Sequence, residues 1–348
     1  MVAQRGAARF IATALVISAP LLLGAAYHAH RERSMAQLGA VRAANAAAGS
    51  FAGRRAVVVG ATSGIGRAIA ERLARADFDV TAVGRDAARG AEVVAAMSAA
   101  GRGAHAFVAL DASSLSNAYR AAGALARDGA PIDVLVLTQG IATTQGRTET
   151  AEGLDVKLAT HFFARAAFVD ALLPALRRGP APRVLSVLSA GVHGVYPHWD
   201  ADPELKNYYS LKNAADAAGL YTDLAMDALA RDPANARVTF IHAAPGMVAT
   251  SWGSEMPWWL RPAVRALLRA LGKPPADCAE FMVAPLLQAA EPYGQPAGGW
   301  RLVGQHAEVA APTRGHTAAA RERVWGHTRA LLDAAQARAA AGGGAALR

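Results

Sequence analysis

Short apolar runs alternate with helical patterns along most of the chain. Strands are predicted near 55–60, 79–83, 104–109, 133–138, 183–188, 237–242 and 300–303. Between them lie amphipathic helical patterns, the longest at 151–177 and 206–230. A repeated strand, helix, strand order makes the sheet parallel and places helices on both of its faces. The pattern therefore predicts an α/β fold, with a single doubly wound (Rossmann-type) domain around a parallel sheet of about seven strands.

The N-terminus departs from this alternation. Residues 10–27 form an apolar run broken only by Thr13, Ser18 and Pro20, with arginines on both sides. Eighteen helical residues rise about 27 Å, which is close to the thickness of a bilayer's hydrocarbon core. This run is predicted to be a membrane anchor, with the endoplasmic reticulum as the expected membrane. A cleaved signal peptide and an arginine-containing transit sequence are the alternatives.

The alternation also sets the expected domain limits. Residues 1–50 are predicted to hold the apolar segment and an alanine-rich linker or helical stalk over 34–50. The Rossmann-type domain is expected over 51–330, and a low-complexity tail over 331–348.

Composition excludes several classes of protein. A hydrophobic content of 53% over 348 residues is incompatible with a disordered chain. The formal charge of +9 arises from scattered arginines without zinc-ligand or helix-turn-helix spacing, so no nucleic-acid partner is expected. The single cysteine, Cys278, excludes internal disulfides and a cysteine metal cluster, and no metal is expected. The sequence does not determine the oligomeric state, and a homodimer is one possibility.

A glycine-rich turn follows the first predicted strand. The apolar residues 56–59 run into Gly60, Ala61, Thr62, Ser63, Gly64, Ile65 and Gly66, and a helical pattern comes next. A strand, a glycine turn and a helix N-terminus bring free backbone amides to one point, where they attract a pyrophosphate. The segment therefore predicts a dinucleotide site.

A tyrosine and a lysine four residues apart form the second motif. Tyr208 and Lys212 stand in the predicted helix 206–230, where this spacing places two side chains on one face. An ammonium beside a phenol favours the phenolate, and one cation at about 4 Å supplies about 4 kcal/mol at an effective dielectric near 20. The chain holds 7 tyrosines and only four lysines, so chance explains the spacing poorly. The pair predicts a general acid/base for proton transfer.

With these motifs, Ser189 and residues 245–250 in this order, the chain resembles the short-chain dehydrogenase/reductase family over roughly residues 53–310. It looks most like the retinol-dehydrogenase-like branch, through Gly153-Leu-Asp155 and the Tyr-Ser-Leu-Lys-Asn run at the tyrosine motif. The resemblance implies hydride transfer between a nicotinamide cofactor and a carbonyl or alcohol, with a proton moved by Tyr208.

The same resemblance implies roles for further residues. Lys212 would hold the nicotinamide ribose, and the Ser189 hydroxyl would donate to the substrate oxygen. Where the family's long helix carries an asparagine, this chain has His161, expected either to relay a proton or to be structural. The implied cofactor contacts, besides the glycine turn, are Asp111, Gly140, Pro245, Gly246, Val248 and Thr250. The family's Asn-Asn-Ala-Gly reads Leu-Thr-Gln-Gly here, so Thr138 or Gln139 must remake its contacts.

The residues after the second predicted strand indicate whether the cofactor is NAD(H) or NADP(H). Gly84 stands where enzymes preferring NAD carry a carboxylate, and Arg85 follows it with a planar fork suited to a 2′-phosphate. NADP(H) is therefore the predicted cofactor, with Arg67 as a second candidate cation.

Substrate preference is expected to lie in 193–207 and 252–273. The second segment combines tryptophans with Arg261, Arg265 and Arg269, and predicts a basic amphipathic helix that is either a pocket lid or a bilayer contact. The function predicted is an NADP(H)-dependent oxidoreductase that interconverts a lipophilic carbonyl and alcohol. A catalytically inactive nucleotide-binding protein of the same fold is the alternative.

Overall fold

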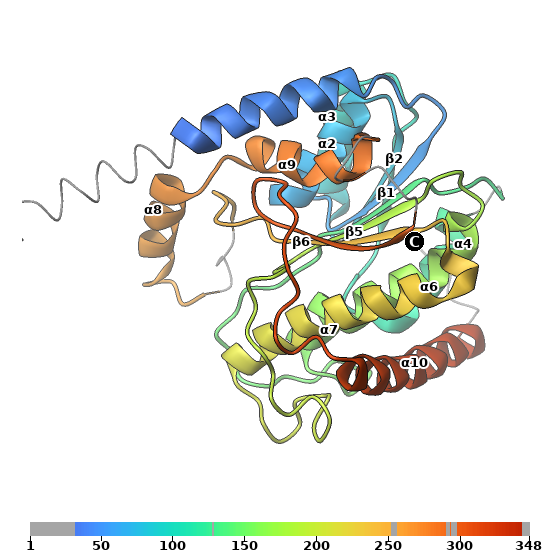
Figure 1. Cartoon of the computed structure of the whole chain (residues 1–348), viewed down its shortest axis with the longest axis vertical. Coiled ribbons are helices and arrows are strands. Elements are labelled where there is room, and N and C mark those ends of the chain that lie inside the picture. The colour runs from blue at the N-terminus through green and yellow to red at the C-terminus, as the bar shows by residue number, and fades with distance from the viewer. Residues whose placement is uncertain (1–31, 127–128, 252–255, 290–292, 294–297, 343–348) are drawn as a thin grey trace, which may run out of the picture.

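A parallel sheet with helices on both faces forms the centre of the protein (Figure 1). The computed structural model describes residues 32–126, 129–251, 256–289, 293 and 298–342. Within them, a seven-stranded sheet has the order β3-β2-β1-β4-β5-β6-β7, with every neighbouring pair parallel. The strands are β1 (Arg55–Val59), β2 (Asp79–Gly84), β3 (Ala106–Ala109), β4 (Val134–Leu137), β5 (Arg183–Val187), β6 (Thr239–Ala243) and β7 (Gly299–Val303). The predicted fold class is confirmed.

Two helical layers enclose this sheet. One layer holds α2 (Gly64–Arg75), α3 (Ala87–Ala100) and α9 (Pro275–Leu287). The other holds α4 (Leu115–Leu125), α6 (Ala164–Leu176), α7 (Leu211–Arg231) and α10 (Ala318–Ala341). The shorter elements are α5 (Val156–Leu158), the π-helical turn η1 (Ala159–Phe163), the 3₁₀ turn η2 (Pro233–Asn235) and α8 (Arg261–Leu271). Figure 1 shows α8 standing at the side, outside both layers.

Strand alternation separates two hydrophobic cores. On β1, Ala56 and Val58 pack into the core under α2 and α9, whereas Val57 and Val59 face the core under α6 and α7. Successive strand residues point to opposite faces, and both faces here are covered, so the strand is apolar throughout. This explains why the buried strands read as continuous apolar runs in the sequence.

The alanine-rich segment before the domain is part of the packed structure. Residues 32–47 are helical, and Leu38 is buried in the core beside α9. The Asn45 amide donates to Glu280, and Arg42 pairs with Asp277 at 2.5 Å. The stalk predicted over 34–50 is thus helical but docked rather than free. The apolar run 10–27 lies outside the described residues, and no helix within the described ranges is long and apolar enough to cross a bilayer.

The C-terminal boundary also differs from the prediction. Helix α10 crosses the expected limit at residue 330, and Leu332 and Ala335 are fully buried. Its buried positions recur every three or four residues, but three of the six are alanines, which weakens the hydrophobic signal of this stripe in the sequence. Within the tail predicted over 331–348, the residues up to Ala341 are therefore helical, and α10 packs on α4 and α7.

This packing makes α10 part of the cooperative unit. Replacing Leu332 by alanine should lower the free energy of unfolding by about 2 to 5 kcal/mol, because a buried leucine leaves a cavity. Gln336→Ala, at an exposed position of the same helix, is the matched control and should change stability little. Urea unfolding measures both, and equal stabilities for the two variants would contradict the docked helix.

Candidate active site and dinucleotide cleft

The glycine turn between β1 and α2 is open to a ligand. Ser63 is the N-cap of α2, but its side chain makes no capping hydrogen bond, so it leaves the first-turn amides unoccupied by a cap. Gly60 has a φ of +87°, and a Cβ on it would lie 2.6 Å from the Gln139 nitrogen. A glycine is therefore required here both by backbone conformation and by the closeness of β4.

Thr138, just after β4, supports this turn through a hydrogen bond to the end of β1. The Thr138 hydroxyl donates to the Val59 carbonyl at 2.8 Å, and the Thr138 amide donates to the same oxygen at 2.9 Å. Thr138 therefore makes the link between strand ends that the sequence required of Thr138 or Gln139. The buried Gln139 amide group has neither its nitrogen nor its oxygen paired within the described structure. Two such buried polar atoms fit a ligand that supplies the missing partners.

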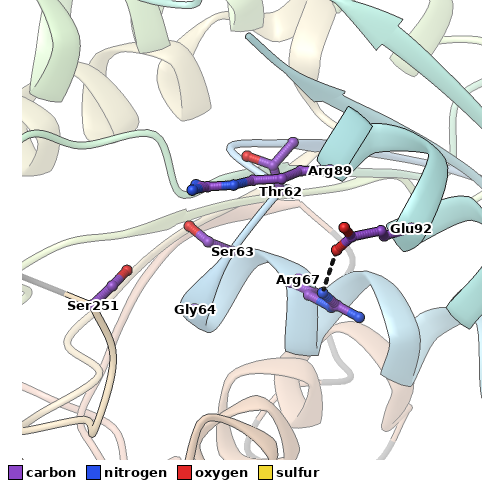
Figure 2. A pocket seen from close by; sticks show the side chains of 7 residues that line it. All are labelled: Thr62, Ser63, Gly64, Arg67, Arg89, Glu92 and Ser251. Atoms are coloured by element: carbon purple, nitrogen blue, oxygen red, sulfur yellow. Dashed lines mark ion pairs between the residues drawn. The ribbon is translucent and has the colours of Figure 1, made fainter. Parts of the chain in front are cut away.

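A cavity of about 350 Å³ opens beside the turn (Figure 2). It is lined by Thr62, Ser63, Gly64, Arg67, Arg89, Glu92 and Ser251. Arg67 pairs with Glu71 at 2.8 Å and with Glu92 at 3.7 Å, whereas Arg89 reaches over the turn from α3.

The end of β2 leaves no room for a carboxylate. A Cβ on Gly84 would lie 2.6 Å from the Thr62 methyl group, so a larger residue would push into the glycine turn. Arg85, the predicted phosphate ligand, is exposed and does not line the cavity. Arg89 does, and the sequence reasoning missed it. The sequence did contain a signal for this residue: Asp86 is a typical N-cap residue, which would have placed Arg89 in the first turn of the following helix.

The loop after β6 closes the other side of the cleft. The Thr250 methyl would lie 3.2 Å from a Cβ on Gly64, so the end of the loop 245–250 approaches the glycine turn. Val248 is buried, and the Ala249 amide donates to the Lys273 carbonyl, which fixes the loop to the end of α8. Asp111, which follows β3, is exposed and accepts hydrogen bonds from Ser113.

His161 lies beneath the end of β4. It sits in η1, and its Nε2 accepts a hydrogen bond from the Ile141 amide at 3.0 Å, beside Gly140. Burial, followed by the charges of Arg165 and Lys157, lowers the pKa of His161 to about 3. The ring is therefore neutral at physiological pH and positions the strand end. A proton-relay role for it stays a prediction.

Ser189 presents an unpaired hydroxyl at the end of β5. Its Oγ is buried and has no hydrogen-bond partner within the described structure. On α7, Gly219 leaves space for it, since a Cβ there would lie 2.5 Å from the Ser189 oxygen. The Ser189 amide donates to Nε2 of His242 at 3.0 Å, which fixes the backbone of the serine. The serine is thus held in place while its hydroxyl stays available.

A buried acidic group extends this contact. Asp223 of α7 bonds Nδ1 of His242 at 2.5 Å and Nε2 of His193 at 2.9 Å. Burial acts to raise the pKa of Asp223. The charges and hydrogen bonds of the two histidines together lower it by more, so the pKa is lowered overall. For His193, burial acts to lower the pKa, but the hydrogen bonds to Asp223 and Gly194 and the nearby carboxylate charges together outweigh it, so the pKa is raised. The sequence reasoning did not identify this His-Asp-His group.

The tyrosine of the Tyr208/Lys212 motif lies outside the helix in which it was predicted. Helix α7 begins after its N-cap Ser210, so Tyr208 precedes the helix and the same-face argument fails. The Asp202 carboxylate accepts the amide of Tyr208 at 2.9 Å and fixes this segment. The Tyr208 ring stacks on His198 with centroids 3.7 Å apart and is 47% exposed.

Lys212 is also engaged elsewhere. It lies in the first turn of α7, and its Nζ pairs with Asp216 at 2.5 Å. Asp216 in turn accepts the Gly194 amide, which joins α7 to the loop after Ser189. Within the described part of the chain, Tyr208 and Lys212 therefore face different partners, and the predicted close pair is not formed in this state.

Comparison with known proteins identifies the family. Residues 54–259 match the short chain dehydrogenase family. Mouse polyprenol dehydrogenase is 33% identical over 280 residues, covering 78% of this chain and 82% of that protein. Human dehydrogenase/reductase SDR family member 13 is 30% identical over 285 residues, covering 80% and 72%. The chain belongs to the short-chain dehydrogenase family, as predicted, and these two relatives support its placement near the retinol-dehydrogenase-like members.

Other relatives match over part of their length or share the fold. An oxidoreductase of Emericella nidulans is 34% identical over 220 residues, which span 65% of that protein. A metagenomic short-chain oxidoreductase solved with NADP has a TM-score of 0.52 at 25% identity and covers 76% of this chain and 98% of that one. A gluconate 5-dehydrogenase of Beutenbergia cavernae with NADP at low occupancy has a TM-score of 0.54 at 27% identity, covering 74% and 96%.

The state of His161 predicts a specific pH dependence. Its pKa is lowered in the fold, so its contribution to stability is complete above the unfolded value of 6.5 and is lost as pH falls toward about 3. At about pH 5 this loss should be about 2 kcal/mol. His161→Asn keeps an acceptor for the Ile141 amide but does not titrate, so its unfolding free energy should fall less between neutral pH and pH 5. Parallel pH profiles for both proteins in urea would contradict this assignment.

Proposed function

We propose that the protein is an NADP(H)-dependent oxidoreductase that interconverts a lipophilic carbonyl compound and its alcohol. The observation that carries this proposal is the unpaired Ser189 hydroxyl, held at the end of β5 next to a cleft formed by the glycine turn and the loop 245–250. Buried hydroxyls are normally hydrogen-bonded, so an unpaired one at the carboxyl edge of a parallel sheet fits a donor awaiting a substrate oxygen.

NADP(H) is favoured over NAD(H) by charge and space. The uncapped amides of α2 suit the pyrophosphate, and Arg89 and Arg67 supply cations at the cavity where the adenosine ribose would lie. A carboxylate at position 84, at the end of β2, would repel a 2′-phosphate. The Thr62 methyl group leaves no space for such a side chain. The two related structures that contain NADP agree with this choice.

Bound nicotinamide would supply or accept the hydride. The Ser189 hydroxyl would donate a hydrogen bond to the substrate oxygen as negative charge develops on it. Tyr208 would give its phenolic proton to that oxygen during reduction and take it back during oxidation. His161 keeps the backbone at Gly140 in place through the Ile141 amide.

For this chemistry two contacts must be exchanged. Tyr208 has to leave the face of His198, and the Lys212 ammonium has to leave Asp216. Both side chains are substantially exposed, with the lysine side chain 77% accessible, so neither movement disturbs the cores. The ribose hydroxyls of the cofactor compete with Asp216 for the lysine, which would couple cofactor binding to formation of the acid.

A lipophilic substrate is favoured by the surroundings of Ser189. Val192, Val195, Leu211 and Met247 lie on the segments that follow β5 and β6 or begin α7, and all four are exposed apolar side chains. Exposed apolar side chains on the segments that flank a polar site favour a ligand with an apolar body. The similarity to mouse polyprenol dehydrogenase places long-chain alcohols in the class to be tried first.

A membrane is the proposed place of action, with residues 10–27 as the anchor. This follows from the apolar run and its flanking arginines. The second candidate function is nucleotide binding without turnover. It is favoured by one observation, the separate partners of Tyr208 and Lys212.

A conservative pair of variants tests the acid. Tyr208→Phe should reduce turnover at least about 100-fold, because proton transfer is lost, while NADPH affinity stays nearly unchanged. Tyr209→Phe is the control, at the adjacent half-buried tyrosine whose hydroxyl donates to the Gln145 carbonyl, and should retain turnover. The assay follows nicotinamide fluorescence with a panel of lipophilic carbonyls and alcohols. Turnover retained by Tyr208→Phe would place the acid elsewhere, and no turnover by wild type on any compound would favour the binding protein.

Cofactor choice is tested at the cavity. Arg89→Ala should weaken NADPH binding about 10- to 100-fold, because one charge-assisted contact to the 2′-phosphate is removed, and leave NADH binding unchanged. Arg102→Ala, an exposed arginine remote from the cavity lining, is the control. Isothermal titration with each nucleotide measures both effects. Equal wild-type affinity for NADPH and NADH would contradict the assignment.

A further inference from the structure

Helix α8 carries an apolar face that the domain does not cover. Of its residues only Leu268 is buried, whereas Leu267 and Leu271 are 50% and 52% exposed. Trp258 and Trp259, immediately before the helix, are 79% and 65% exposed. Exposed apolar groups of this size gathered on one short element mark an interaction site rather than ordinary surface.

The charges of the same segment identify the occupant. Between residues 256 and 276 the chain has four cations, Arg261, Arg265, Arg269 and Lys273, and no acidic residue. The arginines recur every four residues and lie on the flank of the helix away from Leu267 and Leu271. A helix with apolar residues on one face, arginines beside them and tryptophans at its end matches the interface of an anionic bilayer.

The position of α8 agrees with a bilayer on this side of the molecule. The Ser34 hydroxyl hydrogen-bonds His306, and the Lys273 ammonium donates to the neighbouring Gln305 carbonyl. The start of the described chain and the end of α8 therefore meet at one turn. The apolar run 10–27 ends only a few residues before this point in the sequence. Figure 1 shows the N-terminal helix beginning on the same side as α8.

We propose that α8, together with Trp258 and Trp259, lies in the headgroup region of an anionic lipid bilayer and forms a membrane contact in addition to the one proposed for residues 10–27. The contact stands next to the cleft, because Lys273 bonds the backbone of the loop containing Met247 and Ala249. A substrate dissolved in the bilayer would then reach the cleft without crossing water. Contact of α8 with a bilayer does not depend on the reaction.

Spin labels on the full chain test this contact. Leu267→Cys places a label on the apolar face of α8, and Gln336→Cys on α10 is the matched control at an exposed position of the other helical layer. The native Cys278 is buried, and burial raises its thiol pKa to about 12, so it should not label. Accessibility to oxygen and to a water-soluble nickel chelate is measured in vesicles of phosphatidylcholine with and without phosphatidylserine.

The expected result is a label at 267 shielded from nickel and open to oxygen in the phosphatidylserine vesicles, with the label at 336 remaining in water. Arg265→Gln combined with Arg269→Gln should remove the shielding at 267. A label at 267 that stays open to nickel in both vesicles would overturn the proposal. Spin–spin broadening at 267 without lipid would overturn it as well, since it assigns the face to a second copy of the chain. Failure of turnover in the Tyr208 test leaves these outcomes unchanged.

Discussion

The close meeting of β1 and β4 is the constraint on which the rest of the site depends. The sheet reverses its strand order between these strands, so the chain leaves them in opposite directions and opens a crevice at their carboxyl ends. The crevice stays narrow because Thr138 bonds the Val59 carbonyl and because Gly60 and Gly66 carry no Cβ. A larger residue at either glycine would separate the strand ends and remove the open helix N-terminus from the cleft.

Helix α7 connects the other half of the site. Its side chains bind one supporting element after another: Asp216 holds the loop after Ser189, Asp223 holds His242 beneath the serine, and Asp227 pairs with residues before and in α10. Buried carboxylates are stable only when paired and hydrogen-bonded, so each fixes its partner as firmly as its own position. The serine is therefore positioned by a network on α7 rather than by its turn alone.

The sheet and the cofactor turn could be predicted from sequence because both depend on local patterns. Apolar runs set the strands, and the order of glycines set the turn at residues 60–66. The failures concern long-range partners. Ser210 is the N-cap of α7, so Tyr208 lies outside the helix, and Lys212 forms an ion pair with Asp216. Arg89 lines the cavity from the neighbouring helix α3. The docking of residues 32–47 and of α10 was not apparent from the sequence, because both segments are rich in alanine. Alanine can be buried in a core, but it contributes little to a hydrophobic pattern.

The separate engagement of Tyr208 and Lys212 bears most directly on the proposed reaction, because the proposed proton transfer requires both side chains to turn toward the cleft. A crystal structure of the NADPH complex measures this directly. The account predicts that the dinucleotide lies across the ends of β1 and β4, that Lys212 has left Asp216, and that the Tyr208 and Ser189 hydroxyls face the nicotinamide together. Bound NADPH with Tyr208 still stacked on His198 and Lys212 still paired with Asp216 would contradict it.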